Sequence, residues 1–251
     1  MEQTELLIES SLDGTMQPSL FFRSESAEKR PLLVSLHTWS FNRTSLVKTM
    51  LPLAERLQFN LLLPEFRGPN LAQNPNCTKA CASVFAMQDI KDAIDYLISN
   101  DEIDKDNVFL LGQSGGGHMA LMMAGYCPEY FKAVASYVPI TDLSKWTEQN
   151  GIYRPRVIAC CTESREEMLK RSPVTYIDNI AKANLKIFHG KYDPIVHVSH
   201  SIDFYIELTK RYPDARVYLD IFDGGHEIDL NTAEYWIRSQ YKGADKIDVL
   251  G

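Results

Sequence analysis

The 251-residue sequence predicts an α/β protein with a mostly parallel, twisted sheet of about eight strands flanked by helices. Two observations lead to this fold class. Short apolar runs alternate along the chain with longer amphipathic segments, which is the pattern of right-handed βαβ units. Most of the apolar runs also lack a clean polar–apolar alternation, as expected of parallel strands that are buried on both faces.

The predicted strands are short runs rich in Val, Ile, Leu and Phe. Asp13-Gly14 lies between the first two runs and predicts a tight turn. These two strands should therefore form an antiparallel hairpin at one edge of the sheet. The eight runs are Leu6–Glu9, Ser19–Arg23, Leu32–His37, Asn60–Glu65, Asn107–Gly112, Ala133–Val138, Lys186–His189 and Arg216–Phe222.

Four longer segments have apolar residues at helical spacing. They are Ser45–Leu57, Val84–Ile98, His197–Tyr212 and a segment that starts near Asn231. Residues 141–183 fit the alternation poorly, because polar and aromatic residues interrupt short helical pieces. We expect a single α/β domain over residues 1–251, in which 141–183 form a small cap-like insertion above the carboxyl ends of the strands.

Charge and hydropathy exclude several classes of partner. The formal net charge is -7 and no run of Lys or Arg stands out, which argues against nucleic acid and against an anionic membrane surface. The first residues lack the basic start and apolar stretch of a signal peptide. The sequence thus predicts a cytoplasmic protein, with a removed signal peptide as the alternative, and it leaves the oligomeric state open.

The five cysteines match neither a zinc nor a thioredoxin spacing. Cys77 and Cys81 are spaced CxxxC, and Cys160 and Cys161 are adjacent. Reduced thiols are the favoured interpretation in a chain large enough to build its own core. A disulfide between Cys77 and Cys81 is the main alternative.

A serine stands at a sharp strand-to-helix turn. The buried run that ends at Gly112 leads directly into Gln113-Ser114-Gly115-Gly116-Gly117, and a helical pattern follows. This GxSxG context predicts a nucleophile elbow, in which glycines relieve crowding and the Ser114 hydroxyl stands at a helix N-terminus. A phosphate-binding loop is the other interpretation of such a turn, but no Lys-Ser/Thr pair follows and GxGxxG is not completed.

A serine nucleophile needs a base and an acid that orients the base. His226 follows the last predicted strand in a loop with Gly224 and Gly225, so we predict that His226 is the base. His189 ends a strand and is expected to pack, and His197 and His200 are expected to face solvent.

Two aspartates compete as the orienting acid. Asp193 lies in the turn after the penultimate strand, and its loop should lie beside that of His226. Asp142, which follows the preceding strand, is the rival. The order serine, aspartate, histidine is that of α/β-hydrolases, and we favour Asp193.

Acyl transfer also needs two N–H groups that hold an oxyanion. The Gly115 amide, directly after the nucleophile, is one predicted donor. The second should come from the loop after the strand that ends at His37, where the Trp39 amide is the candidate and the Thr38 amide the alternative. No metal or cofactor is needed for this chemistry.

The order of these motifs resembles the catalytic domain of the prolyl oligopeptidase family and its stand-alone esterase relatives. The resemblance covers nearly the whole chain and implies Ser114, Asp193 and His226 as the catalytic triad. Two departures stand out: the chain has no room for the family's N-terminal β-propeller, and Thr38 stands where many relatives have glycine. The motifs, in order, are Ser11-Leu12-Asp13-Gly14, His37, Phe66-Arg67-Gly68, Gln88 to Ile94, the Ser114 elbow, Ser172 to Tyr176, His189 to Asp193 and Gly225-His226.

Three functions remain open at this point. The leading hypothesis is a serine hydrolase that cleaves carboxylic esters, because the missing propeller leaves an open site. Its substrate would be a small-molecule ester or an acetylated or feruloylated carbohydrate. The second is a prolyl oligopeptidase-like peptidase or aminopeptidase, with Glu163, Glu166 and Glu167 as candidates to hold a substrate amine. The third is a non-catalytic binding protein. Phe66, Trp146 and Tyr192 are the predicted aromatic lining of the substrate pocket.

Overall fold

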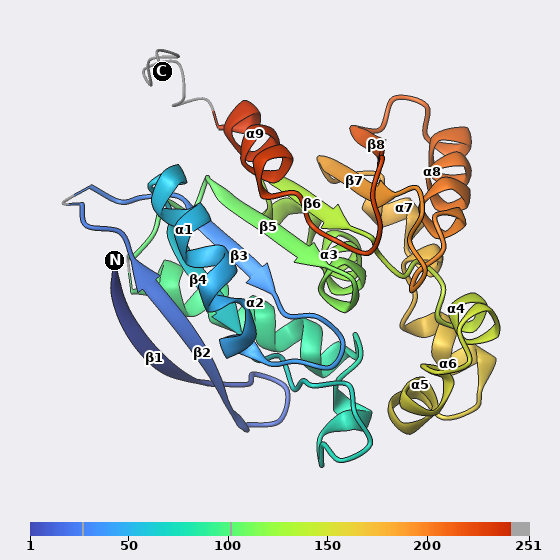
Figure 1. Cartoon of the computed structure of the whole chain (residues 1–251). Helices are drawn as coiled ribbons and strands as arrows, with labels where there is room; N and C mark the ends of the chain where they lie inside the picture. The colour runs from blue at the N-terminus through green and yellow to red at the C-terminus, as the bar shows by residue number, and fades with distance from the viewer. Residues whose placement is uncertain (27, 101, 242–251) are drawn as a thin grey trace.

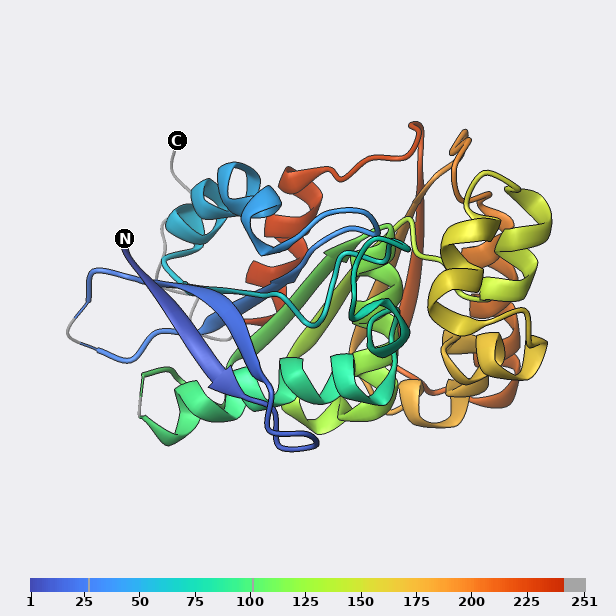
Figure 2. The same ribbon diagram turned by 90° about the horizontal axis from the view of Figure 1, so that it is seen from below.

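The computed structural model describes residues 1–26, 28–100 and 102–241. Within these ranges one eight-stranded sheet runs through the molecule, with helices on both faces (Figures 1 and 2). The strand order is β1-β2-β4-β3-β5-β6-β7-β8, and the predicted α/β fold class is confirmed. All eight predicted strands form, each with its ends within a few residues of the prediction. Their bounds are β1 Glu2–Glu9, β2 Met16–Arg23, β3 Leu32–Leu36, β4 Asn60–Pro64, β5 Val108–Gln113, β6 Ala133–Tyr137, β7 Leu185–Gly190 and β8 Val217–Phe222.

The sheet is parallel from β4 to β8, and the β1–β2 and β2–β4 pairs are antiparallel. The predicted hairpin is therefore confirmed, and Gly14 takes the positive φ of 70° that its turn requires. In register, Leu36 of β3 lies beside Gly112 of β5, and Gly190 of β7 lies beside Phe222 of β8. The loops that follow these four strands consequently leave the same edge of the sheet.

Helices cover the sheet in two layers, α1 and α9 on one face and α2, α3, α7 and α8 on the other (Figures 1 and 2). Two apolar cores separate these helices from the sheet, because the inner strands present apolar side chains to both faces. The helix bounds are α1 Val47–Leu57, α2 Val84–Ser99, α3 Gly115–Tyr126, α7 Ile177–Ile180, α8 Ser199–Arg211 and α9 Leu230–Gln240.

Residues 141–183 form short helices, as their broken pattern predicts. α4 spans Leu143–Gln149, α5 Arg154–Cys161 and α6 Arg165–Lys170, and α7 follows. A third apolar cluster joins these helices to the loop after β3, because Trp39 packs edge-on against Trp146 with ring centroids 5.0 Å apart. The segment thereby reaches the end of the sheet from which the β3 loop emerges.

Among the described residues, no helix combines the length and the apolar character that crossing a bilayer requires.

Candidate active site

Ser114 stands at a strained turn between β5 and α3. Its backbone has φ 57° and ψ −119°, a region that residues with a side chain rarely adopt. The Ser114 amide donates a hydrogen bond of 2.9 Å to the Tyr137 carbonyl at the end of β6, which holds the turn against the neighbouring strand. A Cβ atom on Gly112 would lie 2.1 Å from the Gly116 carbonyl oxygen, so the turn requires glycine there.

Two further predicted residues meet Ser114 at this edge. The Nε2 atom of His226 lies 2.8 Å from Ser114 Oγ, and its Nδ1 atom lies 2.7 Å from Asp193 Oδ2. Asp193 can only accept, so Nδ1–H donates to it and Nε2 is left to accept the serine proton. The Tyr192 amide donates to the Gly224 carbonyl over 2.9 Å, which keeps the Asp193 and His226 loops side by side.

Asp193 is surrounded by hydrogen-bond donors. Its Oδ1 atom accepts from the Ile195 and Val196 amides at 2.8 and 2.9 Å, while Oδ2 faces His226 and, at 3.5 Å, Nε2 of His189. Burial alone would raise the pKa of Asp193, but the hydrogen bonds from His189 and His226 outweigh it and hold the pKa well below its usual value. The carboxylate therefore stays ionised and can stabilise an imidazolium.

The rival acid and the other histidines have structural roles. Asp142 caps α4 by accepting from the Lys145 amide over 3.1 Å. His189 is fully buried as predicted, whereas the prediction that His200 faces solvent is wrong. His200 packs against Thr141, and burial lowers its pKa to about 3, so it stays neutral.

The two predicted oxyanion donors lie beside each other. A Cβ atom placed on Gly115 would come within 2.5 Å of the Trp39 amide nitrogen, so the α3 N-terminus and the β3 loop are in close contact. The Thr38 carbonyl oxygen lies 3.0 Å from Nδ1 of His37. Because C=O and N–H of a trans peptide point in opposite directions, this contact turns the Trp39 N–H away from His37.

A cavity of about 310 Å³ opens beside Ser114 and His226. None of the three predicted aromatic residues is in the lining of this cavity: Phe66 stacks on His37 with centroids 3.9 Å apart, Trp146 packs edge-on against Trp39, and Tyr192 is 62% exposed. The aromatic residues that do line it are Trp39, Phe41 and Tyr153. The complete lining is Thr38, Trp39, Ser40, Phe41, Gln113, Ser114, Tyr153 and His226.

Sequence reasoning missed Phe41 and Tyr153 for different reasons. Phe41 lies two residues beyond Trp39 in the same loop, so its position was a usable signal. Tyr153 precedes α5 in the segment that has no regular pattern, and only tertiary packing brings it to Ser114. Arg156 of α5 donates to Ser40 Oγ over 2.9 Å and ties the two parts of the cavity wall together.

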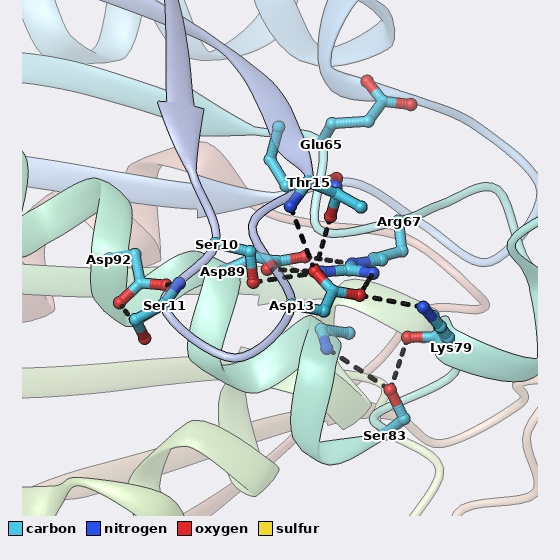
Figure 3. Close-up of polar contacts among 12 residues, drawn as sticks. Ser10, Ser11, Asp13, Thr15, Glu65, Arg67, Lys79, Ser83, Asp89 and Asp92 are labelled. Atoms are coloured by element: carbon cyan, nitrogen blue, oxygen red, sulfur yellow. Dashed lines mark hydrogen bonds and ion pairs between the residues drawn. The ribbon is translucent and has the colours of Figure 1, made fainter.

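The loop after β4 is fixed by a buried ion network (Figure 3). The Arg67 side chain is 1% exposed and pairs with Asp89 of α2, with 2.6 Å between Nε and Oδ2. Arg67 also pairs with Asp13 of the β1–β2 turn, with 2.8 Å between Nη1 and Oδ2. The guanidinium group is the hydrogen-bond donor in both pairs, because it has no acceptor atom. Hydrogen bonds from Arg67 and Lys79 hold the pKa of Asp13 far below its usual value. The network thus joins the hairpin, α2 and the β4 loop, whose Glu65 carbonyl lies 2.8 Å from Nε2 of His37.

Replacing Arg67 with methionine should destabilise the fold by about 3–5 kcal/mol, because Asp89 would be left buried without its partner. Unfolding in urea, followed by circular dichroism, measures the change. Arg211→Met is the matched control, since Arg211 and Glu207 are both about half exposed and such pairs contribute under about 1 kcal/mol. Equal losses in the two variants would contradict a special role for the buried network.

Comparison with known proteins assigns the chain to a family. A model of the prolyl oligopeptidase family matches residues 83–246, a stretch that contains Ser114, Asp193 and His226. The chain belongs to the prolyl oligopeptidase family. Membership confirms the predicted resemblance and makes the chain a member of a serine hydrolase family.

Two curated relatives are acylamino-acid-releasing enzymes. Acylamino-acid-releasing enzyme 2 of Oryza sativa subsp. japonica is 26% identical over 247 residues, which cover 89% of this chain and 31% of the relative. The human acylamino-acid-releasing enzyme is 26% identical over 178 residues, or 65% of this chain and 24% of the relative. The chain therefore spans about a third or less of the length of these relatives.

Solved structures support the α/β-hydrolase fold of this family member. A puromycin-hydrolyzing peptidase of Mycobacterium tuberculosis superposes with a TM-score of 0.74 at 16% identity, over 95% of this chain and 39% of that one. An acylaminoacyl peptidase of Pyrococcus horikoshii gives a TM-score of 0.72 at 19% identity, over 95% and 40%.

The predicted activity as a carboxylic-ester hydrolase, and with it the carbohydrate ester substrate, is wrong. The curated relatives include acylamino-acid-releasing enzymes, and the peptidase alternative fits these relatives and the family better. The same triad attacks ester and amide carbonyls, so the motifs around Ser114 do not separate the two substrates. The ester interpretation depended on the expectation of a site without a propeller, yet the acylamino-acid-releasing relatives match this same segment.

Proposed function

We propose that this family member is a serine peptidase that cleaves the peptide bond after an N-terminally acylated residue. The observation that carries the proposal is the continuous hydrogen-bonded series from Ser114 Oγ through His226 to Asp193, with distances of 2.8 and 2.7 Å. The acylamino-acid-releasing enzymes among the curated relatives, and the family itself, support the choice of an amide substrate.

In the proposed reaction, His226 Nε2 takes the hydroxyl proton as Ser114 Oγ attacks the peptide carbonyl. Asp193 stabilises the imidazolium that forms. His226 then protonates the leaving amine, and an acyl-enzyme remains on Ser114. A water molecule, deprotonated by His226, releases the acylated amino acid and restores the serine.

The Gly115 and Trp39 amides are proposed to hold the oxyanion. The start of α3 adds its orphan N–H groups and the positive end of the helix dipole on the same side of Ser114. Among described residues no hydrogen bond uses the Trp39 amide, which leaves this donor for substrate. His37 supports the arrangement by holding the preceding Thr38 carbonyl.

The cavity favours an uncharged N-terminus over a free amine. None of its described lining residues is acidic. The three glutamates considered for binding an amine lie outside this lining and pair with other side chains: Glu163 with Arg154 at 3.7 Å, Glu166 with Lys170 at 3.0 Å and Glu167 with Arg171 at 3.2 Å. A substrate ammonium that left water would have no carboxylate partner here, whereas an acyl cap avoids this cost.

Comparison of two anilides tests the proposal. We expect N-acetyl-alanine p-nitroanilide to be cleaved with a kcat/KM at least about tenfold above that of alanine p-nitroanilide, a difference of about 1.4 kcal/mol in transition-state binding. Equal turnover, or preference for the free amine, would overturn the acyl-peptide assignment. If a fluorophosphonate labelled Ser114 but neither anilide were cleaved, Ser114 would be a reactive serine and the proposed peptidase activity would be refuted.

One relative makes activity itself worth testing: mouse inactive dipeptidyl peptidase 10 is 26% identical over 118 residues, 47% of this chain and 14% of the relative. The intact hydrogen-bonded series at Ser114 favours catalysis in this chain over binding alone.

A further inference from the structure

Four of the five cysteines gather between two segments that lie far apart in the sequence. Cys77 and Cys81 belong to the loop after β4, and Cys160 and Cys161 form the end of α5. The sulfur atoms of Cys81 and Cys161 are 3.5 Å apart. All five cysteines are free thiols. The Cys77 thiol donates a hydrogen bond to the Ala159 carbonyl of α5.

This geometry changes which disulfide is plausible. The sequence suggested Cys77 and Cys81 as the alternative to free thiols, but Cys81 faces the helix. A disulfide needs its sulfurs about 2.05 Å apart, so Cys81 and Cys161 would have to approach by roughly 1.5 Å. Their positions 80 residues apart mean that this bond would close a long loop.

The thiols of the cluster differ in exposure and in pKa. Cys77 is only partly buried and opens the cluster toward solvent, whereas Cys81 and Cys161 are 1% and 0% exposed. Hydrogen bonds from Cys81 and Cys77 outweigh burial and lower the pKa of the adjacent Cys160, whereas burial raises the pKa of Cys77 and raises that of Cys81 well above its usual value. Among described residues no group of three or more His, Cys, Asp or Glu is placed to hold a metal ion, so the chemistry here is that of thiols.

We propose that Cys81 and Cys161 are a modification site that a hydroperoxide converts to a reversible disulfide, which links the β4 loop to α5. In the first step one sulfur attacks the peroxide, the O–O bond breaks, and an alcohol leaves (water, for hydrogen peroxide). In the second step the partner sulfur attacks the resulting sulfenic acid, the S–O bond breaks, and water leaves with the thiol proton. Two thiols lose two electrons, and the hydroperoxide accepts them.

The bond would join two segments that border the proposed active site. The Cys81 amide donates to Asn70 Oδ1 over 2.8 Å, and the Asn70 amide donates to the Trp39 carbonyl over 2.9 Å. On the other side, α5 starts next to Tyr153, which lines the cavity at Ser114. Two hydrogen bonds therefore connect Cys81, one end of the proposed disulfide, to Trp39 in the loop after β3.

Peptide mapping tests this pair without using enzyme activity. Reduced protein is treated with hydrogen peroxide, remaining thiols are alkylated, and trypsin is added without reductant. Cleavage after Lys79, Lys91, Arg156 and Arg165 places Cys77, Cys81 and the α5 pair in different peptides. We expect peptide 80–91 joined to peptide 157–165, alkylated Cys77, a fall from five to three titratable thiols, and reversal by dithiothreitol.

Single variants identify the partner thiol. Cys161→Ser should lose the cross-link, and Cys127→Ser, which removes a buried cysteine outside the cluster, should keep it. Circular dichroism checks that the variants fold, and Cys81→Ser provides a second loss of the same cross-link. A cross-link that persists in Cys161→Ser, a link through the Cys77 peptide, or oxidation to sulfinic acid without any cross-link would each overturn the proposal.

Discussion

Replacing Ser114 with alanine is expected to lower kcat for peptide hydrolysis by about 10⁶-fold, the effect that loss of the nucleophile has in serine hydrolases with this triad. The variant keeps His226 and Asp193 but has no oxygen that can form the acyl-enzyme. Its fold should persist, because the strain at φ 57° comes from the backbone and the side chain is 8% exposed at the cavity. Single-turnover and steady-state assays with N-acetyl-alanine p-nitroanilide measure the loss.

A matched serine variant separates this effect from activity that is lost during expression and purification. Ser99 lies on the exposed end of α2, and Ser99→Ala should retain the parent rate. Fluorophosphonate labelling followed by peptide mapping should modify Ser114 in the parent and nothing in Ser114→Ala. Hydrolysis that survives in Ser114→Ala at a rate near that of the parent would show that another residue is the nucleophile.

Replacing Asp193 with asparagine is expected to lower kcat by about 10⁴-fold at neutral pH. The amide can donate to His226 Nδ1, which turns the imidazole into the tautomer that carries its proton on Nε2. That nitrogen then cannot take the Ser114 proton, and the neutral amide cannot stabilise an imidazolium. The low pKa of Asp193 means that the parent keeps its carboxylate ionised throughout the assay range.

The rival aspartate provides the control for this variant. Asp142 caps α4, and asparagine caps helices about as well as aspartate, so Asp142→Asn should preserve both stability and rate. Rates are compared under saturating and limiting substrate, which separates kcat from KM. If Asp142→Asn lost as much activity as Asp193→Asn, the acid would have to be reassigned.

The strands and the order of the motifs could be predicted because they depend on local rules. Inner strands such as Leu32–Leu36 and Val108–Gln113 are continuous apolar runs, and burial on both faces of a parallel sheet requires that pattern. The proximity of Ser114, Asp193 and His226 was also predictable, since each follows a strand and parallel strands end at one edge. Their catalytic roles, like the extent of the single domain, stay predictions.

The cavity wall and the thiol cluster could not be predicted in this way. Tyr153 and the pair at the end of α5 lie in short helices that residues 141–183 form without a repeating pattern. Phe66 and Trp146 are aromatic, as pocket residues often are. In the structure, however, Phe66 packs against His37 and Trp146 against Trp39, and neither lines the cavity.

The sequence by itself determined the sheet, the elbow at Ser114 and the positions of the two residues proposed to act with Ser114. The spacing of apolar residues encodes the strands and helices, and the order of the motifs along the chain places the three residues at one edge of the sheet. Only the tertiary structure decided which aromatic rings face the serine and which thiols face each other. Such contacts join segments about 80 residues apart, and no local preference specifies them. They follow from how the irregular helices pack against the β3 and β4 loops.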